Sequence, residues 1–120
     1  MPNGKICYVE IPTTDAEASA RFYETVFDWK SRTRGDGARA FDDSTGSVSG
    51  AFVTSRPPHT TVDVMTYVMV DDLDATLARV VAAGGKIVQP RTVIGPSDDA
   101  YGFFADPAGN VFGLYQEPTK

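Results

Sequence analysis

Cysteine and histidine, which often form disulfides, metal sites and catalytic sites, are scarce in this sequence. It contains one cysteine, Cys7, and one histidine, His59. A single cysteine cannot form an intramolecular disulfide, and a single histidine cannot build a multi-histidine metal site. Cys7 lies in a β-branched run, so we expect it to be a small buried hydrophobic residue. His59 follows two prolines, so we expect it to lie in a solvated linker.

Positive charge and long apolar runs are also limited. Eleven Lys and Arg stand against sixteen Asp and Glu, a net charge of −5, and no segment gathers the basic residues that bind a phosphate backbone. No apolar run approaches the roughly eighteen residues of a membrane span. The segment MPNGKICYVEIP lacks the pattern of a secretion signal. We therefore expect a cytoplasmic protein without nucleic-acid or membrane partners.

The sequence does contain an internal repeat. Residues 8–27, YVEIPTTDAEASARFYETVF, match residues 65–84, MTYVMVDDLDATLARVVAAG, at a constant offset of 57 residues, and both segments fit a strand followed by an amphipathic helix. The expected buried faces are Ala16, Ser19, Ala20, Tyr23, Val26 and Phe27, then Leu73, Thr76, Leu77, Val80, Ala83 and Gly84. Thr14 with Glu17, and Asp71, are the expected N-terminal caps, and Gly84 and Gly85 are expected to end the second helix.

A second match lies further along each copy. Residues 43–52, DSTGSVSGAF, match residues 106–115, DPAGNVFGLY, at an offset of 63 residues, and the pattern predicts a tight turn followed by a strand. The larger offset places about six additional residues in the second copy, which we assign to a loop over 90–100. The 120 residues are thus expected to form one α+β domain with module one at about 1–54, a linker at 55–63 and module two at about 64–120.

Three segments carry a resemblance to a known family. They are YVEIPTTDAEASARFYETVFDW, YVMVDDLDATLARVVAAGGKIV and GFFADPAGNVFGLYQ. Their order and spacing resemble the vicinal-oxygen-chelate superfamily, which includes glyoxalases, bleomycin-resistance proteins and extradiol dioxygenases. The resemblance implies two tandem βαβββ modules whose curled, mostly antiparallel sheets form a cup for a small ligand. It also implies a homodimer, because modules of this family often complete their cups across a subunit interface.

The same resemblance implies where metal ligands would lie. The family's ligand positions fall on Tyr8, Gly50, Met65 and Gly113. Glycine has no side chain, a methionine thioether suits soft copper, and neutral tyrosine is a poor ligand for hard divalent ions. We therefore expect neither a metal nor another cofactor.

Strand alternation predicts the wall of the cup, because residues two apart share a face. The expected ligand-binding residues are Tyr8, Glu10, Phe52, Met65, Tyr67, Met69 and Tyr115. Such a wall suits a flat or apolar organic molecule, and the glycines at positions 50 and 113 would leave open space beside the sheet. Each of these side chains could instead pack the core, which is also the interpretation we favour for Trp29.

The leading hypothesis is a metal-independent small-molecule-binding protein that holds an aromatic or amphipathic ligand. The alternative is a glyoxalase-like lyase, isomerase or dioxygenase, either with Glu10 as a buried general base or with a metal site that the alignment misplaces. For Glu10 itself, the interpretation we favour is a half-exposed strand residue paired with a nearby Lys or Arg. A third possibility is an interaction module whose cup is filled by its own side chains.

Overall fold

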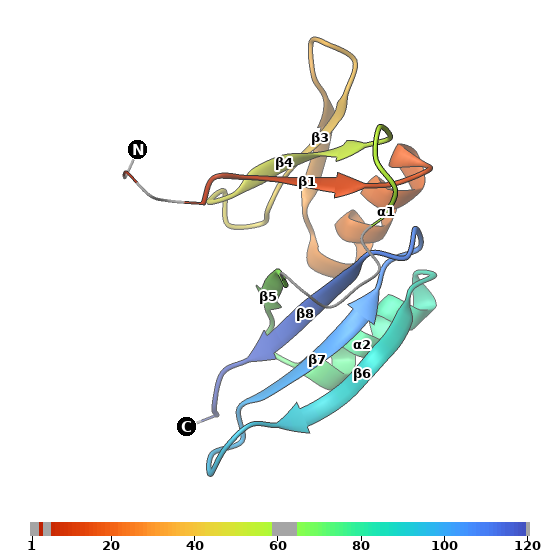
Figure 1. Ribbon diagram of the computed structural model, residues 1–120. Coiled ribbons are helices and arrows are strands. Elements are labelled where there is room, and N and C mark those ends of the chain that lie inside the picture. The colour runs from red at the N-terminus through yellow and green to blue at the C-terminus, as the bar shows by residue number, and fades with distance from the viewer. Residues whose placement is uncertain (1–2, 4–5, 59–64, 120) are drawn as a thin grey trace.

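The computed structural model describes residue 3 and residues 6–58 and 65–119. It contains eight strands and two helices within those residues, arranged as two βαβββ modules (Figure 1). The elements of the first module are β1 (Tyr8–Pro12), α1 (Ala16–Phe27), β2 (Lys30–Thr33), β3 (Arg39–Asp42) and β4 (Ser49–Val53). Those of the second are β5 (Tyr67–Met69), α2 (Leu73–Ala82), β6 (Lys86–Val93), β7 (Ala100–Ala105) and β8 (Val111–Gln116).

The two sheets share one topology, with strand orders β1-β4-β3-β2 and β5-β8-β7-β6. In each module the first and last strands pair in parallel, and the remaining pairs are antiparallel. The helix of each module packs on one face of its sheet and leaves the opposite face without a helix. The α+β fold of two tandem modules that the repeat predicts is therefore confirmed.

Helix α1 has the expected span but a different cap. Asp15 is the N-cap, with an extended backbone and a carboxylate that accepts a hydrogen bond from the Ala18 amide at 3.1 Å. The expected capping pair of Thr14 and Glu17 is wrong, because Glu17 instead pairs with Arg39 of β3, Oε1 to Nε 2.9 Å.

Helix α2 shows the same one-residue difference. Its N-cap is Asp72, which accepts from the Ala75 amide at 3.0 Å, and not Asp71. The predicted stop is confirmed, since the helix ends at Ala82 and Gly84 follows with a φ of 99°. Within the described residues neither helix is long and apolar enough to cross a bilayer.

The two modules meet at a buried polar contact. The Tyr23 hydroxyl of α1 donates to Asp106 Oδ2 in the β7–β8 turn at 3.0 Å. Asn110 Nδ2 donates to the same oxygen at 3.0 Å and to the carbonyl of Pro12, at the end of β1, at 2.6 Å. Tyr23, Asp106 and Asn110 are all at most 3% exposed. Side chains from both modules thus satisfy one buried carboxylate.

Burial shifts the pKa values of both ionisable groups in this contact. It raises the pKa of Asp106, although hydrogen bonds from Asn110 and Tyr23 act in the opposite direction. Burial and the neighbouring carboxylate raise the pKa of Tyr23 well above its ordinary value, so its hydroxyl remains a donor.

Aromatic rings surround this junction. Trp29 stacks between Tyr23 and Phe41, with ring centroids 4.8 Å apart on each side. Phe104 and Phe112 of the second module extend the same cluster. Trp29 is only 8% exposed, which confirms it as a core residue.

The structure contradicts the expectation for Cys7, shortens the expected loop at 90–100 and does not describe His59. Cys7 is exposed, so the prediction of a buried residue is wrong, because it precedes the start of β1. The expected loop at 90–100 is shorter, since β6 continues to Val93 through two register shifts and only the residues after it turn toward β7. His59, together with the rest of 59–64, lies outside the described residues.

Replacing Tyr23 with Phe tests the junction. We expect a loss of about 1–3 kcal/mol in the free energy of unfolding, because the buried Asp106 carboxyl loses a hydrogen-bond partner. Urea denaturation measures this change. The matched control is Tyr8→Phe, where the hydroxyl contacts Arg34 at an exposed site and the expected change is within about 0.5 kcal/mol. Equal effects of the two substitutions would contradict the role of the junction.

Candidate functional site

The turns before β4 and β8 share a sequence pattern but differ in length. In module one the hairpin closes from the Asp43 amide to the Val48 carbonyl at 2.9 Å. In module two it closes from the Asp106 amide to the Asn110 carbonyl at 2.8 Å. The first turn therefore contains one more residue, and a one-residue shift moves each later side chain to the other face of the strand.

This shift changes the wall expected in module one. Glu10 pairs with Ala51, and Phe52 pairs with Ile11 on the face that packs against α1. Phe52 is 4% exposed and lies beside the rings of Tyr23 and Phe41. The expectation that Phe52 shares a face with Tyr8 and Glu10 is wrong, because the matched sequences count from the turn and the turns differ in length.

Module two keeps the expected register. Tyr67 pairs with Gly113 and Met69 with Tyr115, on the face of the sheet away from α2. In the next strand, Tyr101 pairs with Tyr115. Tyr67, Met69 and Tyr115, which the sequence predicts as wall residues, are thus brought together on one surface.

We call this surface the aromatic face. It borders a pocket of about 520 Å³ whose lining residues are Tyr67, Met69, Ile94, Tyr101 and Tyr115. Tyr67 is 49% exposed and Met69 is 62% exposed, so both remain available to a ligand. Sequence reasoning missed Tyr101 and Ile94, although the alternation of Tyr101 and Phe103 in β7 could have indicated the former.

The two glycines do not leave the open space expected of them. A Cβ at Gly113 would lie 2.5 Å from the ring of Tyr67, which crosses the strand at this point. A Cβ at Gly50 would lie 1.9 Å from the Val9 carbonyl oxygen and 2.6 Å from the Phe41 ring. The missing side chains make room for the protein's own atoms, so this argument for a cavity is wrong.

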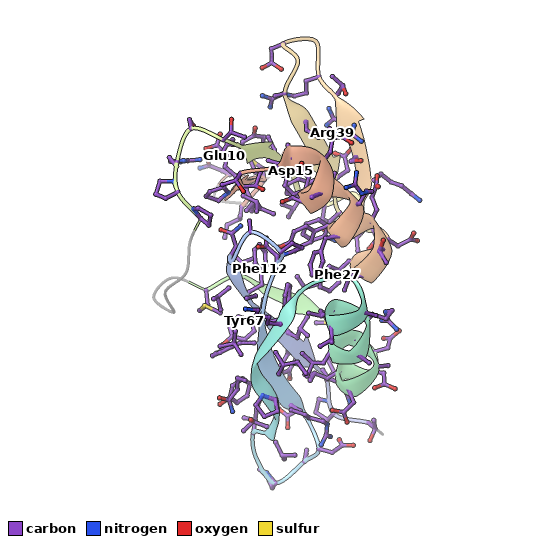
Figure 2. All side chains as sticks on the ribbon, turned by 90° about the vertical axis from the view of Figure 1, so that its right-hand side faces the viewer. Glu10, Asp15, Phe27, Arg39, Tyr67 and Phe112 are labelled. Carbon is purple, nitrogen blue, oxygen red and sulfur yellow. The ribbon has the colours of Figure 1, made fainter. Side chains whose placement is uncertain are left out.

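The helix-free face of module one is polar. The Tyr8 hydroxyl accepts a hydrogen bond from Arg34 Nη1 at 2.8 Å, and Glu10 forms an ion pair with Arg56. Glu10 is exposed, so it fits the paired strand residue that the sequence allowed better than a buried base. Figure 2 shows Glu10 on the first module and Tyr67 on the second.

Met65 belongs to a different cavity. A pocket of about 530 Å³ lies between the modules, with the buried rings of Trp29, Phe41 and Phe112 among its lining residues. Met65 lines this junction pocket and not the pocket of the aromatic face, whereas Met69 lines both. The seven residues of the expected wall are therefore divided among two sheet faces, the core and this junction.

The four metal-ligand positions do not fit a metal. Tyr8 is engaged by Arg34, positions 50 and 113 have no side chain, and Met65 offers only a thioether. In the part of the chain that the structure describes, no three His, Cys, Asp or Glu side chains gather in a way that could hold a metal ion.

The geometry defines a protein of the paired βαβββ class with one aromatic face, and comparisons identify its family. The sequence profile of the Glyoxalase/Bleomycin resistance protein/Dioxygenase superfamily matches residues 5–114. A glyoxylase-like domain-containing protein of Didymella fabae is 31% identical over 125 residues, with 98% of each chain covered. The chain therefore belongs to this superfamily, as the resemblance of its motifs predicts.

The chain is also similar to a second curated protein and to a solved structure. Anthracycline biosynthesis protein DnrV of Streptomyces peucetius is 31% identical over 134 residues, and the match covers 95% of this chain but 47% of DnrV. The crystal structure of a glyoxalase/bleomycin resistance protein/dioxygenase family enzyme from Burkholderia phytofirmans has a TM-score of 0.74 at 22% identity. It covers 91% of this chain and 95% of that one, and it supports the fold.

Two glycine substitutions test the register difference. Gly50→Ala should cost about 3 kcal/mol or more, because the new Cβ meets a backbone carbonyl that cannot move freely. Gly113→Ala should cost less than about 1 kcal/mol, because the half-exposed Tyr67 ring can swing away.

Chemical denaturation of both variants gives the comparison. Gly35→Ala is the control, since a Cβ there meets nothing within 4 Å. Similar losses at positions 50 and 113 would show that the two glycines are structurally equivalent and that the register difference is incorrect.

Proposed function

We propose that this protein binds a small aromatic or amphipathic molecule on the aromatic face of module two, without a metal ion. The observation that carries the proposal is the pocket formed by three tyrosines with Met69 and Ile94. Aromatic rings provide large contact areas for flat ligands, and a methionine adapts its shape to more than one ligand. The similarity to DnrV, an anthracycline biosynthesis protein by its name, is consistent with a small organic ligand.

The position of Glu10 fits a binding protein better than an enzyme that uses Glu10 as its general base. A general base must reach a substrate proton, and its carboxylate must be free to accept it. Glu10 is bound to Arg56 on the polar face of module one, whereas the aromatic pocket lies in module two. The enzyme hypothesis with Glu10 as base therefore has no observation in its favour.

We further propose that the protein is a homodimer in which a second copy covers part of the aromatic face. Tyr67, Met69 and Ile94 are each about half exposed or more, and contiguous apolar surface of this kind commonly marks an interface. Sedimentation equilibrium should give twice the monomer mass, and Met69→Lys should shift the species toward the monomer. A wild-type protein that stays monomeric at high concentration would rule out this pairing.

The binding site can be tested with a neutral hydrophobic dye. N-phenyl-1-naphthylamine should gain fluorescence on adding the protein, and Tyr101→Ala should weaken its binding about tenfold through the loss of ring contact. The control is Thr25→Ala, which lies on α1 and outside the aromatic pocket. Unchanged binding by the Tyr101 variant would place the dye elsewhere.

Metal independence has its own test. Untagged protein should contain substoichiometric Mn, Fe, Ni and Zn by elemental analysis, and treatment with a chelator should leave dye binding unchanged. Stoichiometric metal that is lost together with dye binding would contradict the proposal. It would support the metal-dependent enzyme alternative.

A further inference from the structure

We infer that the ligand of the aromatic face carries a positive charge on or beside its ring system, as an aromatic amine does. This inference rests on the proposed function and names its ligand class. It depends on two carboxylates that lie one residue beyond the strands bearing the tyrosines.

The strand register places these carboxylates. Ala100 of β7 pairs with Gln116 of β8, and both side chains lie on the face of the sheet that α2 covers. Ala100 is fully buried there, and the Gln116 side chain accepts a hydrogen bond from the Leu73 amide of α2 at 2.8 Å. Tyr101 and Tyr115, one residue inward, lie on the aromatic face. Side chains alternate between faces along a strand.

Asp99 and Glu117 are one residue outward from that helix-side pair. The alternation therefore directs both toward the same side as Tyr101 and Tyr115. The Asp99 carboxylate also lies near Tyr115, close enough to act on the pKa of its hydroxyl. Burial, followed by the charges of Asp99 and Glu117, raises the pKa of Tyr115, as expected where the local potential is negative.

The segments that carry these acids are fixed to each other. Asp98, next to Asp99, accepts a hydrogen bond from the Thr119 amide at 2.8 Å, two residues after Glu117. The Ile94 amide donates to the Asp99 carbonyl at 2.9 Å, which closes the β6–β7 turn. These contacts fix the backbone of the two segments that carry Asp99 and Glu117, next to Ile94 of the pocket lining.

No basic side chain is among the residues that line this pocket. Arg91 on β6 has Nε 4.0 Å from Asp74 Oδ2 of α2, and its Nη2 donates to the backbone carbonyl of Asp98 at 3.4 Å. On module one, by contrast, Glu10 and Asp42 pair with Arg56 and Arg32. Within the described residues no Lys or Arg forms an ion pair with Asp99 or Glu117, so their charge remains available to a ligand.

Aromatic faces and carboxylates attract the same kind of group. A cation over a tyrosine ring gains about 0.5–2 kcal/mol, and a nearby carboxylate adds a direct Coulomb attraction. An anionic ligand would meet two like charges in the same place. The pocket therefore selects a cationic ring system over a neutral or anionic one of the same shape.

Three tricyclic probes of similar size test this selection: cationic 9-aminoacridine, neutral 9-anthracenemethanol and anionic 9-anthracenecarboxylate. Equilibrium dialysis at one ionic strength should show the cation bound about tenfold more tightly than the neutral probe, and the anion bound most weakly. In the variant Asp99→Asn with Glu117→Gln, the cation should lose about tenfold in affinity while the neutral probe is unchanged.

The control variant is Asp28→Asn with Asp36→Asn, which removes the same charge from module one at exposed positions. It should bind all three probes as the unmodified protein does. Equal binding of the three probes would overturn the inference and leave the proposed function intact, whereas binding of none would refute the proposed function itself. A cation preference that falls equally in both variants would reflect net charge alone and would also overturn the inference.

Discussion

The hydrogen bonds to the Asp106 carboxylate are the contact on which the arrangement of the two modules depends. A buried carboxylate is costly unless donors surround it. Here the donors are the Tyr23 hydroxyl, the Asn110 side chain and three backbone amides of the β7–β8 turn. Four of these donors belong to module two, and the Tyr23 hydroxyl comes from module one. Docking therefore adds the last donor to the buried carboxylate and the bond from Asn110 to the end of β1.

Docking through the helices determines which surfaces stay available. The aromatic cluster around Tyr23 and Trp29 packs between the modules beside the junction pocket, and α1 contacts α2. The sheet faces opposite the helices are therefore left without a covering layer (Figure 1). On module one that face carries ion pairs, and on module two it carries the tyrosine-rich pocket. A single repeated architecture thus presents two surfaces of different chemistry.

Much of this fold could be predicted from sequence, because a repeated strand-helix pattern is a signal carried by many residues. Both helices occupy the expected residues, with Tyr23, Leu77 and Val80 buried as their spacing predicts. The caps differ by one residue because each true cap, Asp15 or Asp72, lies beside a residue of similar capping ability. Periodicity locates a helix well but does not decide between adjacent caps.

The site was harder to predict because sheet faces depend on register. The motifs beginning at Asp43 and Asp106 match in sequence, yet their turns close at Val48 and Asn110, after different numbers of residues. The aligned residues of the two motifs do not reveal this difference in turn length. The difference moves Phe52 from the expected wall into the core.

Module two kept its register, so Tyr67, Met69 and Tyr115 lie together as expected. Tyr101 and Ile94 were missed because they come from β7 and from the turn before it. The family's ligand positions lie on the first and last strands and give no information about either segment.

The central claim is that the aromatic face, and not the junction pocket, holds the ligand. Protein labelled with ¹³C at the methionine methyl groups allows a direct test, because Met69 lines the aromatic pocket while Met65 lines only the junction pocket. On titration with 9-aminoacridine, with the signals assigned by Met→Leu variants, the Met69 signal should shift and the Met65 signal should remain in place. A Met65 shift as large as that of Met69, or no shift of either signal at saturating ligand, would contradict the account.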